Sequence, residues 1–156
     1  MATTRERIRM TETEVTAFLA QPLKLQLATI NRDGTPHLVT MYYAVFDGLI
    51  GFWTYRTSQK AVNLERDPRV TCLVETGTGY DQLVGVQING TVERIADPAE
   101  IRTIGTAVYG RYVSELGDLG AYLDDQARKR WAYLVQPTKI SSWDHRKLAA
   151  AVSAGS

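Results

Sequence analysis

The sequence has 156 residues, with 18 lysines and arginines against 17 aspartates and glutamates, which gives a formal net charge of +1. Because neither sign of charge is concentrated, we do not expect nucleic acid or an anionic membrane as the main partner. The single cysteine excludes an internal disulfide and suits a reducing cytoplasm, and no stretch has the pattern of a signal peptide or a membrane span. We therefore expect a cytoplasmic protein with one domain over residues 1–148 and a disordered tail at 149–156.

In chain order, the apolar pattern and the turn signals predict mainly β structure with helical additions. A first helix is expected to begin at Thr11, whose hydroxyl can form a capping box with Glu14. A later helix is expected to begin at Asp97, and another to span 121–129. The predicted strands are 23–30, 36–46, 49–54, 69–75, 83–95, 131–136 and 138–143.

The succession of these strands indicates how they pair. The first three are separated only by short turns, so we expect them to form an antiparallel meander. Gly85 and Gly90 lie inside a long strand, where glycine permits curvature or the close approach of another backbone. Strands in hairpin order with a few helices between them indicate an antiparallel barrel.

The segment from Phe52 to Val70 combines a strand end with the start of a helix. Ser58 is expected to cap this helix, and Asp67-Pro68 to end it, because the residue before proline avoids the α region. Hydroxyl, amide and ammonium donors gather at the helix start, on Thr54, Thr57, Ser58, Gln59 and Lys60. Together with the free N–H groups of the first turn, they suit a phosphate group, although an ordinary capped surface helix has the same composition.

Other kinds of active site find little support in the sequence. A metal site needs several clustered ligands, and the chain has one cysteine and two distant histidines, His37 and His145. No Gly-x-Ser-x-Gly elbow of a serine hydrolase and no Gly-x-Gly-x-x-Gly pattern of a dinucleotide site is present. We therefore expect neither a metal site, nor a hydrolase, nor a Rossmann nucleotide site.

Three stretches carry a resemblance to a known superfamily: the run from Ala28 to Glu75, the segment YDQLVGVQINGTVE and the closing SSWDHRKL. They resemble the split-barrel flavin and deazaflavin oxidoreductases, which are the pyridoxamine 5'-phosphate oxidase-like superfamily. The last two stretches and SQKAVNLERDPRV are most similar to its branch B, which depends on the deazaflavin coenzyme F-420. The resemblance covers about Thr11 to Leu148. It implies an antiparallel split β-barrel of the FMN-binding type that forms a homodimer, with two cofactor sites at the interface.

The resemblance also implies which residues contact the cofactor. In relatives, the strand end and the following helix hold the phosphate tail, which corresponds here to Trp53, Thr54, Ser58, Gln59, Lys60 and Asn63. Thr40 and Met41 match the strand that lies along the ring system, unless they only pack in the barrel. Tyr80 and Trp143 resemble positions near the cofactor or the facing subunit, and Trp143 can equally close the barrel. Gln59 stands where the FMN-binding oxidases carry arginine, and Ser58 stands where these oxidases and some deazaflavin relatives carry arginine at this position or the next, so the loss of these cations argues against FMN.

The function that the resemblance implies is an oxidoreductase in which reduced coenzyme F-420 gives a hydride to an unsaturated organic acceptor, such as an enone, a quinone or a tetrapyrrole. No catalytic side chain is evident. Tyr42, Tyr43, Tyr80 or water can supply the matching proton. Two alternatives remain open: an FMN-dependent oxidase or reductase, and a non-catalytic carrier of deazaflavin or haem.

Overall fold

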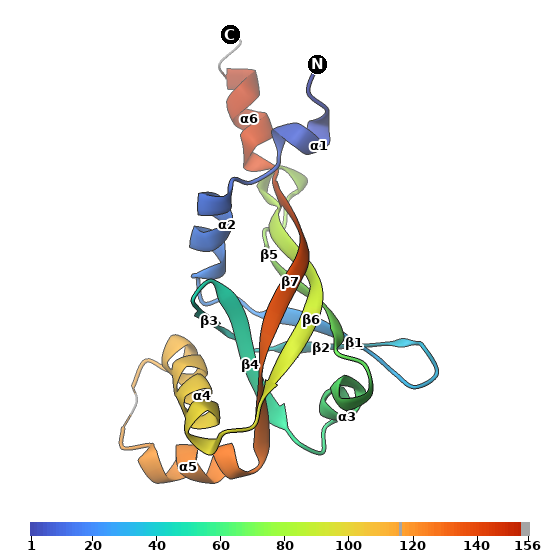
Figure 1. Ribbon diagram of the computed structural model, residues 1–156. Helices are drawn as coiled ribbons and strands as arrows, with labels where there is room; N and C mark the ends of the chain where they lie inside the picture. Colours follow the sequence, from blue (N-terminus) through green and yellow to red (C-terminus); the bar gives the residue numbers. More distant parts are fainter. Residues whose placement is uncertain (116, 154–156) are drawn as a thin grey trace.

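The computed structural model describes residues 1–115 and 117–153, and it shows one curled antiparallel sheet with helices packed around it (Figure 1). In these described residues the sheet has seven strands, in the order β2-β1-β5-β6-β7-β4-β3. Their bounds are β1 Leu25–Ile30, β2 Pro36–Met41, β3 Ala44–Phe46, β4 Leu49–Tyr55, β5 Arg69–Thr76, β6 Val84–Ile95 and β7 Arg130–Asp144. The predicted fold class, mainly β with an antiparallel barrel and helical additions, is confirmed.

The two edges of the sheet are joined by a very short link. Only Tyr42 and Tyr43 separate β2 from β3, yet these strands lie at opposite edges, so the sheet must curl until its edges approach each other. Tyr43 marks the break, because its side chain is fully buried and its hydroxyl donates to the Leu19 carbonyl oxygen at 2.8 Å. The single strand predicted over 36–46 is therefore wrong, and so is the three-strand meander: β1 pairs with β2, and β3 pairs with β4.

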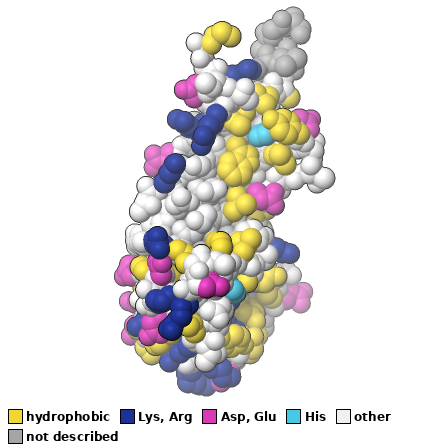
Figure 2. Space-filling model, turned by 90° about the vertical axis from the view of Figure 1, so that its right-hand side faces the viewer, with side chains coloured by type: hydrophobic (Ala, Val, Ile, Leu, Met, Phe, Trp, Pro, Cys, Tyr) yellow, Lys and Arg dark blue, Asp and Glu magenta, His cyan; other side chains and the backbone are white. Residues whose placement is uncertain are grey.

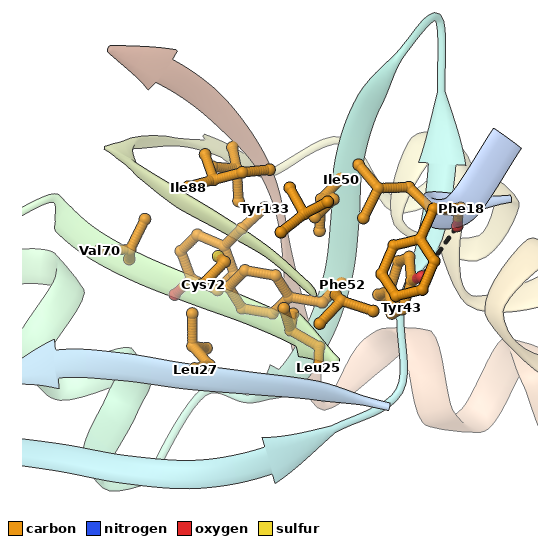
Figure 3. Packing of buried hydrophobic residues seen from close by; sticks show 14 of the residues in the cluster. Phe18, Leu25, Leu27, Tyr43, Ile50, Phe52, Val70, Cys72, Ile88 and Tyr133 are labelled. Carbon is orange, nitrogen blue, oxygen red and sulfur yellow. Dashed lines mark hydrogen bonds between the residues drawn. The ribbon is translucent and has the colours of Figure 1, made fainter. Parts of the chain in front are cut away.

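Alternate strand residues point into the barrel and form its core, which Figure 3 shows from close by. In β1, Leu25, Leu27 and Thr29 are buried, as their alternation predicts. The rings of Phe52 in β4 and Tyr133 in β7 stack within this core, with 5.2 Å between their centroids. The packed core therefore fixes β4 against β7, and the candidate site lies where β4 ends and β7 begins.

A bulge explains why β7 is one long strand. The sequence predicts two strands separated by Pro137, but β7 continues through this residue, and that prediction is wrong. The register of β6 against β7 shifts between Asn89 and Gly90, so Pro137 lies opposite an irregularity, where a missing backbone N–H is tolerated. A Cβ on Gly90 would collide with the carbonyl oxygen of Gln136, which confirms the close backbone approach expected at this glycine.

The helices lie at the two ends of the barrel. Their bounds are α1 Thr4–Arg7, α2 Glu12–Leu19, α3 Gln59–Arg66, α4 Pro98–Tyr112, α5 Gly120–Arg128 and α6 Arg146–Ser153, with a short 3-10 helix, η1, at Tyr80–Gln82. The predicted capping box of α2 is present, since the Thr11 hydroxyl accepts from the Glu14 N–H at 3.2 Å and Glu14 accepts from the Thr11 N–H at 2.7 Å. In Figure 1, α3, α4 and α5 occupy the lower end of the barrel, and α1 and α6 the upper end.

The expected tail, 149–156, lies only partly in the described residues. Helix α6 continues through 149–153, where alanine is frequent and favours helix, whereas residues 154–156 lie outside the described part of the chain. Among the described helices, none is long and apolar enough to cross a membrane.

Candidate functional site

The end of β4 and the start of α3 are tied together by two hydroxyl groups. Thr54 is buried, and its Oγ1 lies 3.2 Å from Oγ of Ser58. Ser58 caps α3 as predicted, since its Oγ accepts from the Ala61 N–H at 3.3 Å. The helix start therefore has a fixed position against the strand, with its free N–H donors and partial positive charge facing away from the helix.

Lys60 stands in the first turn of α3 and is half-buried. Burial lowers the pKa of its ammonium group, and the nearby positive charge of Arg130 lowers it further. No carboxylate forms an ion pair with Lys60 within residues 1–115 and 117–153. A cation that is partly removed from water, beside a second cation and without a counter-ion, is stabilised when an anion binds.

Arg130 reaches this site from the start of β7, where it pairs in register with Tyr55. Its guanidinium lies 4.0 Å from the centre of the Tyr55 ring and 4.7 Å from that of Trp53. One amino group donates to Oε1 of Gln126 at 2.8 Å. Its Nε is buried and has no hydrogen-bond partner in the described part of the chain, so the guanidinium still has a donor to offer.

Arg56 is the third cation near the link between β4 and α3. Its guanidinium lies 3.9 Å from the centre of the Trp131 ring, and its Nε donates to the Arg130 carbonyl oxygen at 3.2 Å. We refer to Arg56, Lys60 and Arg130 as the basic cluster. Sequence reasoning found only Lys60. Arg56 lies in the link between β4 and α3 and was not singled out, whereas Arg130 is brought to α3 only by the pairing of β4 with β7. The signal in the sequence is an arginine beside an aromatic residue at both strand ends, in Tyr55-Arg56 and Arg130-Trp131.

Asn63 and Gln59, both expected near the phosphate, have protein partners in α3 and β1. Asn63 is fully buried, and its Nδ2 donates to Thr29 Oγ1 at 3.0 Å and to Asn31 Oδ1 at 2.9 Å. Its Oδ1 accepts from Nε2 of Gln59 at 2.8 Å. Because both protons of the Asn63 amide are used inside the protein, this residue positions α3 on β1, and the exposed Gln59 is the more accessible of the two.

The remaining expected residues on β2 and β4 are also placed by packing. Trp53 is 8% exposed, and a Cβ on Gly105 of α4 would lie only 2.6 Å from its Cε3, so the indole packs directly against that helix. Thr40 is exposed on β2 and donates to Oε1 of Gln26 at 2.8 Å, whereas Met41 is half-buried and packs on the barrel core. Trp53 is thus a packing residue between β4 and α4, whereas the side chain of Thr40 remains accessible to a ligand.

Within a single copy of the chain, Tyr80 and Trp143 lie far from the other residues that were expected to contact the cofactor. Trp143 pairs with Gly85 near one end of β7, and Arg130 begins the other end. Thirteen steps along a strand correspond to about 40 Å, at roughly 3.3 Å per residue. Tyr80 is 70% exposed, and its ring meets that of His145 edge-on, with 4.6 Å between centroids. Figure 1 shows the same separation, because the end of β7 lies near α6 at one end of the barrel and α3 lies at the other end.

Comparison with known proteins gives one family and several similar structures. The sequence model of the family described as pyridoxamine 5'-phosphate oxidase matches residues 11–144. The crystal structure of the conserved hypothetical protein Rv2991 from Mycobacterium tuberculosis is 41% identical in sequence, with a TM-score of 0.88, over 95% of this chain and 93% of that one.

Two further structures are more distant. A protein described as an F420 reductase is 26% identical, with a TM-score of 0.66, over 80% of this chain and 94% of that chain. HutZ, the haem storage protein from Vibrio cholerae, is 16% identical, with a TM-score of 0.66, over 84% of this chain and 94% of that chain. At this low identity, the likeness to HutZ concerns the fold alone.

Proposed function

Because this chain belongs to the pyridoxamine 5'-phosphate oxidase family, which has the split-barrel fold of flavin-type oxidoreductases, we propose that it is an oxidoreductase dependent on deazaflavin coenzyme F-420. The protein would bind the phosphate tail of the cofactor at the basic cluster and the start of α3. The observation that carries this proposal is the half-buried ammonium of Lys60, which lies beside Arg130 without a carboxylate partner in the described residues.

The donors at this end fit a phosphate group. Lys60 and the buried Nε of Arg130 can form charge-assisted hydrogen bonds, and the first-turn N–H groups of α3 add the favourable end of the helix dipole. The hydroxyls of Thr54 and Ser58 lie at the same point. An anion bound here would also offset the electrostatic repulsion between Lys60 and Arg130. In the described residues, no carboxylate forms an ion pair with either of these cations.

The choice of deazaflavin over FMN rests on two observations. The similar structure described as an F420 reductase covers most of this chain, at 26% identity. Ser58 and Gln59 also replace the arginines that the resemblance places there in FMN-binding relatives. Arg56 and Arg130 supply guanidinium groups from elsewhere, which keeps an FMN-dependent oxidase or reductase as the alternative that the binding test must distinguish.

The chemistry would come from the cofactor, and the protein would supply position and a protected pocket. When bound, reduced deazaflavin supplies a hydride for an unsaturated organic acceptor. Lys60 and Ser58 would hold the tail, so that the ring end is presented at a fixed distance and angle. Tyr43 is unsuited to give the matching proton, because its hydroxyl is committed to Leu19 and burial raises its pKa to about 12. The exposed Tyr42 and Tyr80, or water, remain as proton sources.

A homodimer follows from the same proposal. Trp143 lies far along β7 from the basic cluster, and Tyr80 lies in η1, whose neighbour His145 follows β7, so these two residues would contact a cofactor whose tail is held by a second copy of the chain. The face in Figure 2 carries a strip of hydrophobic side chains in its upper half. Large apolar residues that remain exposed include Leu38, at 65%, and Ile140, at 50%. Burial of such surface between two copies would stabilise the assembly.

The test is equilibrium binding of coenzyme F-420 and, separately, FMN to the purified protein, followed by cofactor fluorescence. We expect deazaflavin to bind more tightly than FMN, and Lys60→Ala to weaken deazaflavin binding by about tenfold, since one charge-assisted bond is lost. Lys24→Ala removes an exposed lysine outside the site and serves as the control. Unchanged affinity in Lys60→Ala would remove the proposed phosphate site.

The same titration separates the alternatives. Tighter binding of FMN would make the protein an FMN-dependent enzyme. Reduction of any acceptor in a panel of enones, quinones and tetrapyrroles by protein loaded with reduced deazaflavin would exclude the role of a non-catalytic carrier.

A further inference from the structure

A cavity of about 810 Å³ lies between α2 and the second half of β7, and we refer to it as the α2–β7 cavity. It exists because β4 pairs with β7 only from Arg130 to Leu134, whereas β7 continues to Asp144. The N-terminal segment fills the far part of this gap, where the Asp144 N–H donates to the Ile8 carbonyl oxygen at 2.7 Å. Figure 1 shows α2 and the β3–β4 hairpin beside the rest of this half of β7. The volume falls within the range of roughly 300–1,000 Å³ that is usual for small-molecule sites.

The floor of the cavity is the inner, core-facing side of the barrel. Ile50, Ile88 and Val135 contribute to it, and each of them is buried. Ile140 lies opposite Ile88 in the register of β6 and β7 and therefore on the same face, yet it is 50% exposed. An inward-facing apolar residue with half of its surface in water shows that the core is not filled at this point.

Aliphatic side chains also form the side walls of the cavity. α2 contributes Val15 and Leu19, and the β3–β4 hairpin contributes Val45 and Leu49. Within residues 1–115 and 117–153, no aromatic residue lines the cavity, so it offers no planar surface for a ring. These walls favour a flexible alkyl chain, because such a chain can adapt to an irregular aliphatic space and make many close contacts there.

Charged residues gather where α1 and its link to α2 border the cavity. The cations are Arg5, Arg9 and Lys139, and the carboxylates are Glu6 and Glu12. None of these residues forms an ion pair with a described residue. Glu6 is already occupied by the cap of α1, since it accepts from the Thr3 N–H at 2.6 Å. Because the cations outnumber the carboxylates, this end of the cavity favours an anionic head group.

We propose that the α2–β7 cavity binds a long-chain carboxylate of the fatty-acid type, with the alkyl chain on the aliphatic floor and the carboxylate beside Arg9 and Lys139. The aliphatic walls and the cations at one end match the two parts of such a ligand. The inference goes beyond the proposed function. No residue of the basic cluster, and neither Tyr80 nor Trp143, lines this cavity.

The experiment is calorimetric titration of the full-length protein with hexanoate, octanoate and decanoate, each below its micelle concentration. We expect one molecule to bind per chain, with an affinity that rises by roughly fourfold for each added methylene group, as the burial of apolar surface predicts. Octanoate should bind about fivefold more tightly than the neutral 1-octanol, since an exposed ion pair contributes up to about that factor.

Variants at the charged end test the position of the carboxylate. Arg9→Gln and Lys139→Gln should each reduce the preference for octanoate over 1-octanol, whereas Lys24→Gln, at an exposed lysine outside the cavity, should leave it unchanged.

A variant on the floor tests the position of the alkyl chain. Ile140→Asp should weaken decanoate binding by roughly tenfold or more, because it places a carboxylate against the chain. Ile140 is half-exposed, so the variant should fold. Leu38→Asp, at a residue of β2 that is 65% exposed and lies outside the cavity, is the matched control and should leave the affinity unchanged. A changed oligomeric state in Ile140→Asp with unchanged decanoate affinity would assign Ile140 to a contact between copies and overturn the proposal.

The remaining outcomes are decided without the cofactor. Absence of decanoate binding, equal affinities for all chain lengths, or binding of many molecules per chain would overturn the proposal. Lys60→Ala should leave decanoate binding unchanged, because Lys60 lies outside the cavity. If decanoate binds as expected but deazaflavin does not, the cavity proposal stands and the proposed function fails. If deazaflavin binds and decanoate does not, the reverse holds.

Discussion

The ammonium of Lys60 lies near the guanidinium of Arg130, although the two residues belong to α3 and β7, and both cations lack a carboxylate partner among the described residues. Each of them costs free energy in the unliganded protein, since one is partly desolvated and the two repel each other. Until an anion binds, the protein should therefore have a lower free energy of unfolding than a variant in which a neutral side chain replaces Lys60.

Lys60→Met should therefore raise the thermal unfolding midpoint at pH 7. The pKa of Lys60 is lowered in the folded state, so the unfolded chain binds the proton more tightly and the wild type gains stability as the pH rises toward 10.5. The advantage of the methionine variant should shrink over that interval. Thermal melts at pH 7 and pH 10 would check this, and a constant difference between the two pH values would contradict it.

Gly105→Ala should destabilise the protein, although alanine favours helix more than glycine does. The new methyl group would lie 2.6 Å from Cε3 of Trp53, and overpacking of this kind costs about 1–3 kcal/mol. Denaturant unfolding would measure the loss. In a Trp53→Leu background the same substitution should cost less, because the ring that it strikes is gone, and an equal cost in both backgrounds would exclude the proposed contact.

Asn63→Ala should lower the free energy of unfolding by about 2–4 kcal/mol, because it opens a cavity and removes the buried partner of Thr29 and Asn31. Gln59→Ala, its exposed neighbour, should cost under about 1 kcal/mol. Urea titrations compare the two variants. If Asn63 only positions α3, the cofactor affinity of folded Asn63→Ala, measured below the unfolding transition, should change less than that of Lys60→Ala.

Cys72 should be unreactive in the native protein. It is 1% exposed inside the barrel, and burial raises the pKa of its thiol to about 12, so almost no thiolate is present near pH 8. Reaction with a chromogenic disulfide reagent should proceed only as the protein unfolds, and should become immediate in denaturant. Complete reaction of the folded protein within seconds would show that the barrel opens at Cys72.

Several features of this protein are local and follow from sequence alone. Thr11 with Glu14, Ser58 and Asp97 cap their helices as predicted, because a capping hydrogen bond links residues only two or three positions apart. The alternation of Leu25, Leu27 and Thr29 gives the inward face of β1 for the same reason. The resemblance to split-barrel oxidoreductases, carried by motifs spread over most of the chain, likewise needs no coordinates.

Features that depend on distant partners were decided by the tertiary structure. The strand expected over 36–46 breaks because Tyr43 turns inward to the Leu19 carbonyl, which no pattern near Tyr43 specifies. β7 passes Pro137 because the bulge at Gly90 lies opposite to it.

The candidate site shows the same division. Lys60 and Ser58 could be assigned from the sequence, because the start of α3 is a local structure. Arg130 could not, since only the pairing of β4 with β7 brings it to that helix. Sequence by itself thus determined the helix caps, the inward face of β1 and the family, whereas the folded sheet decided where β2 and β7 end and which cations converge, because electrostatic interactions act through space and not along the chain.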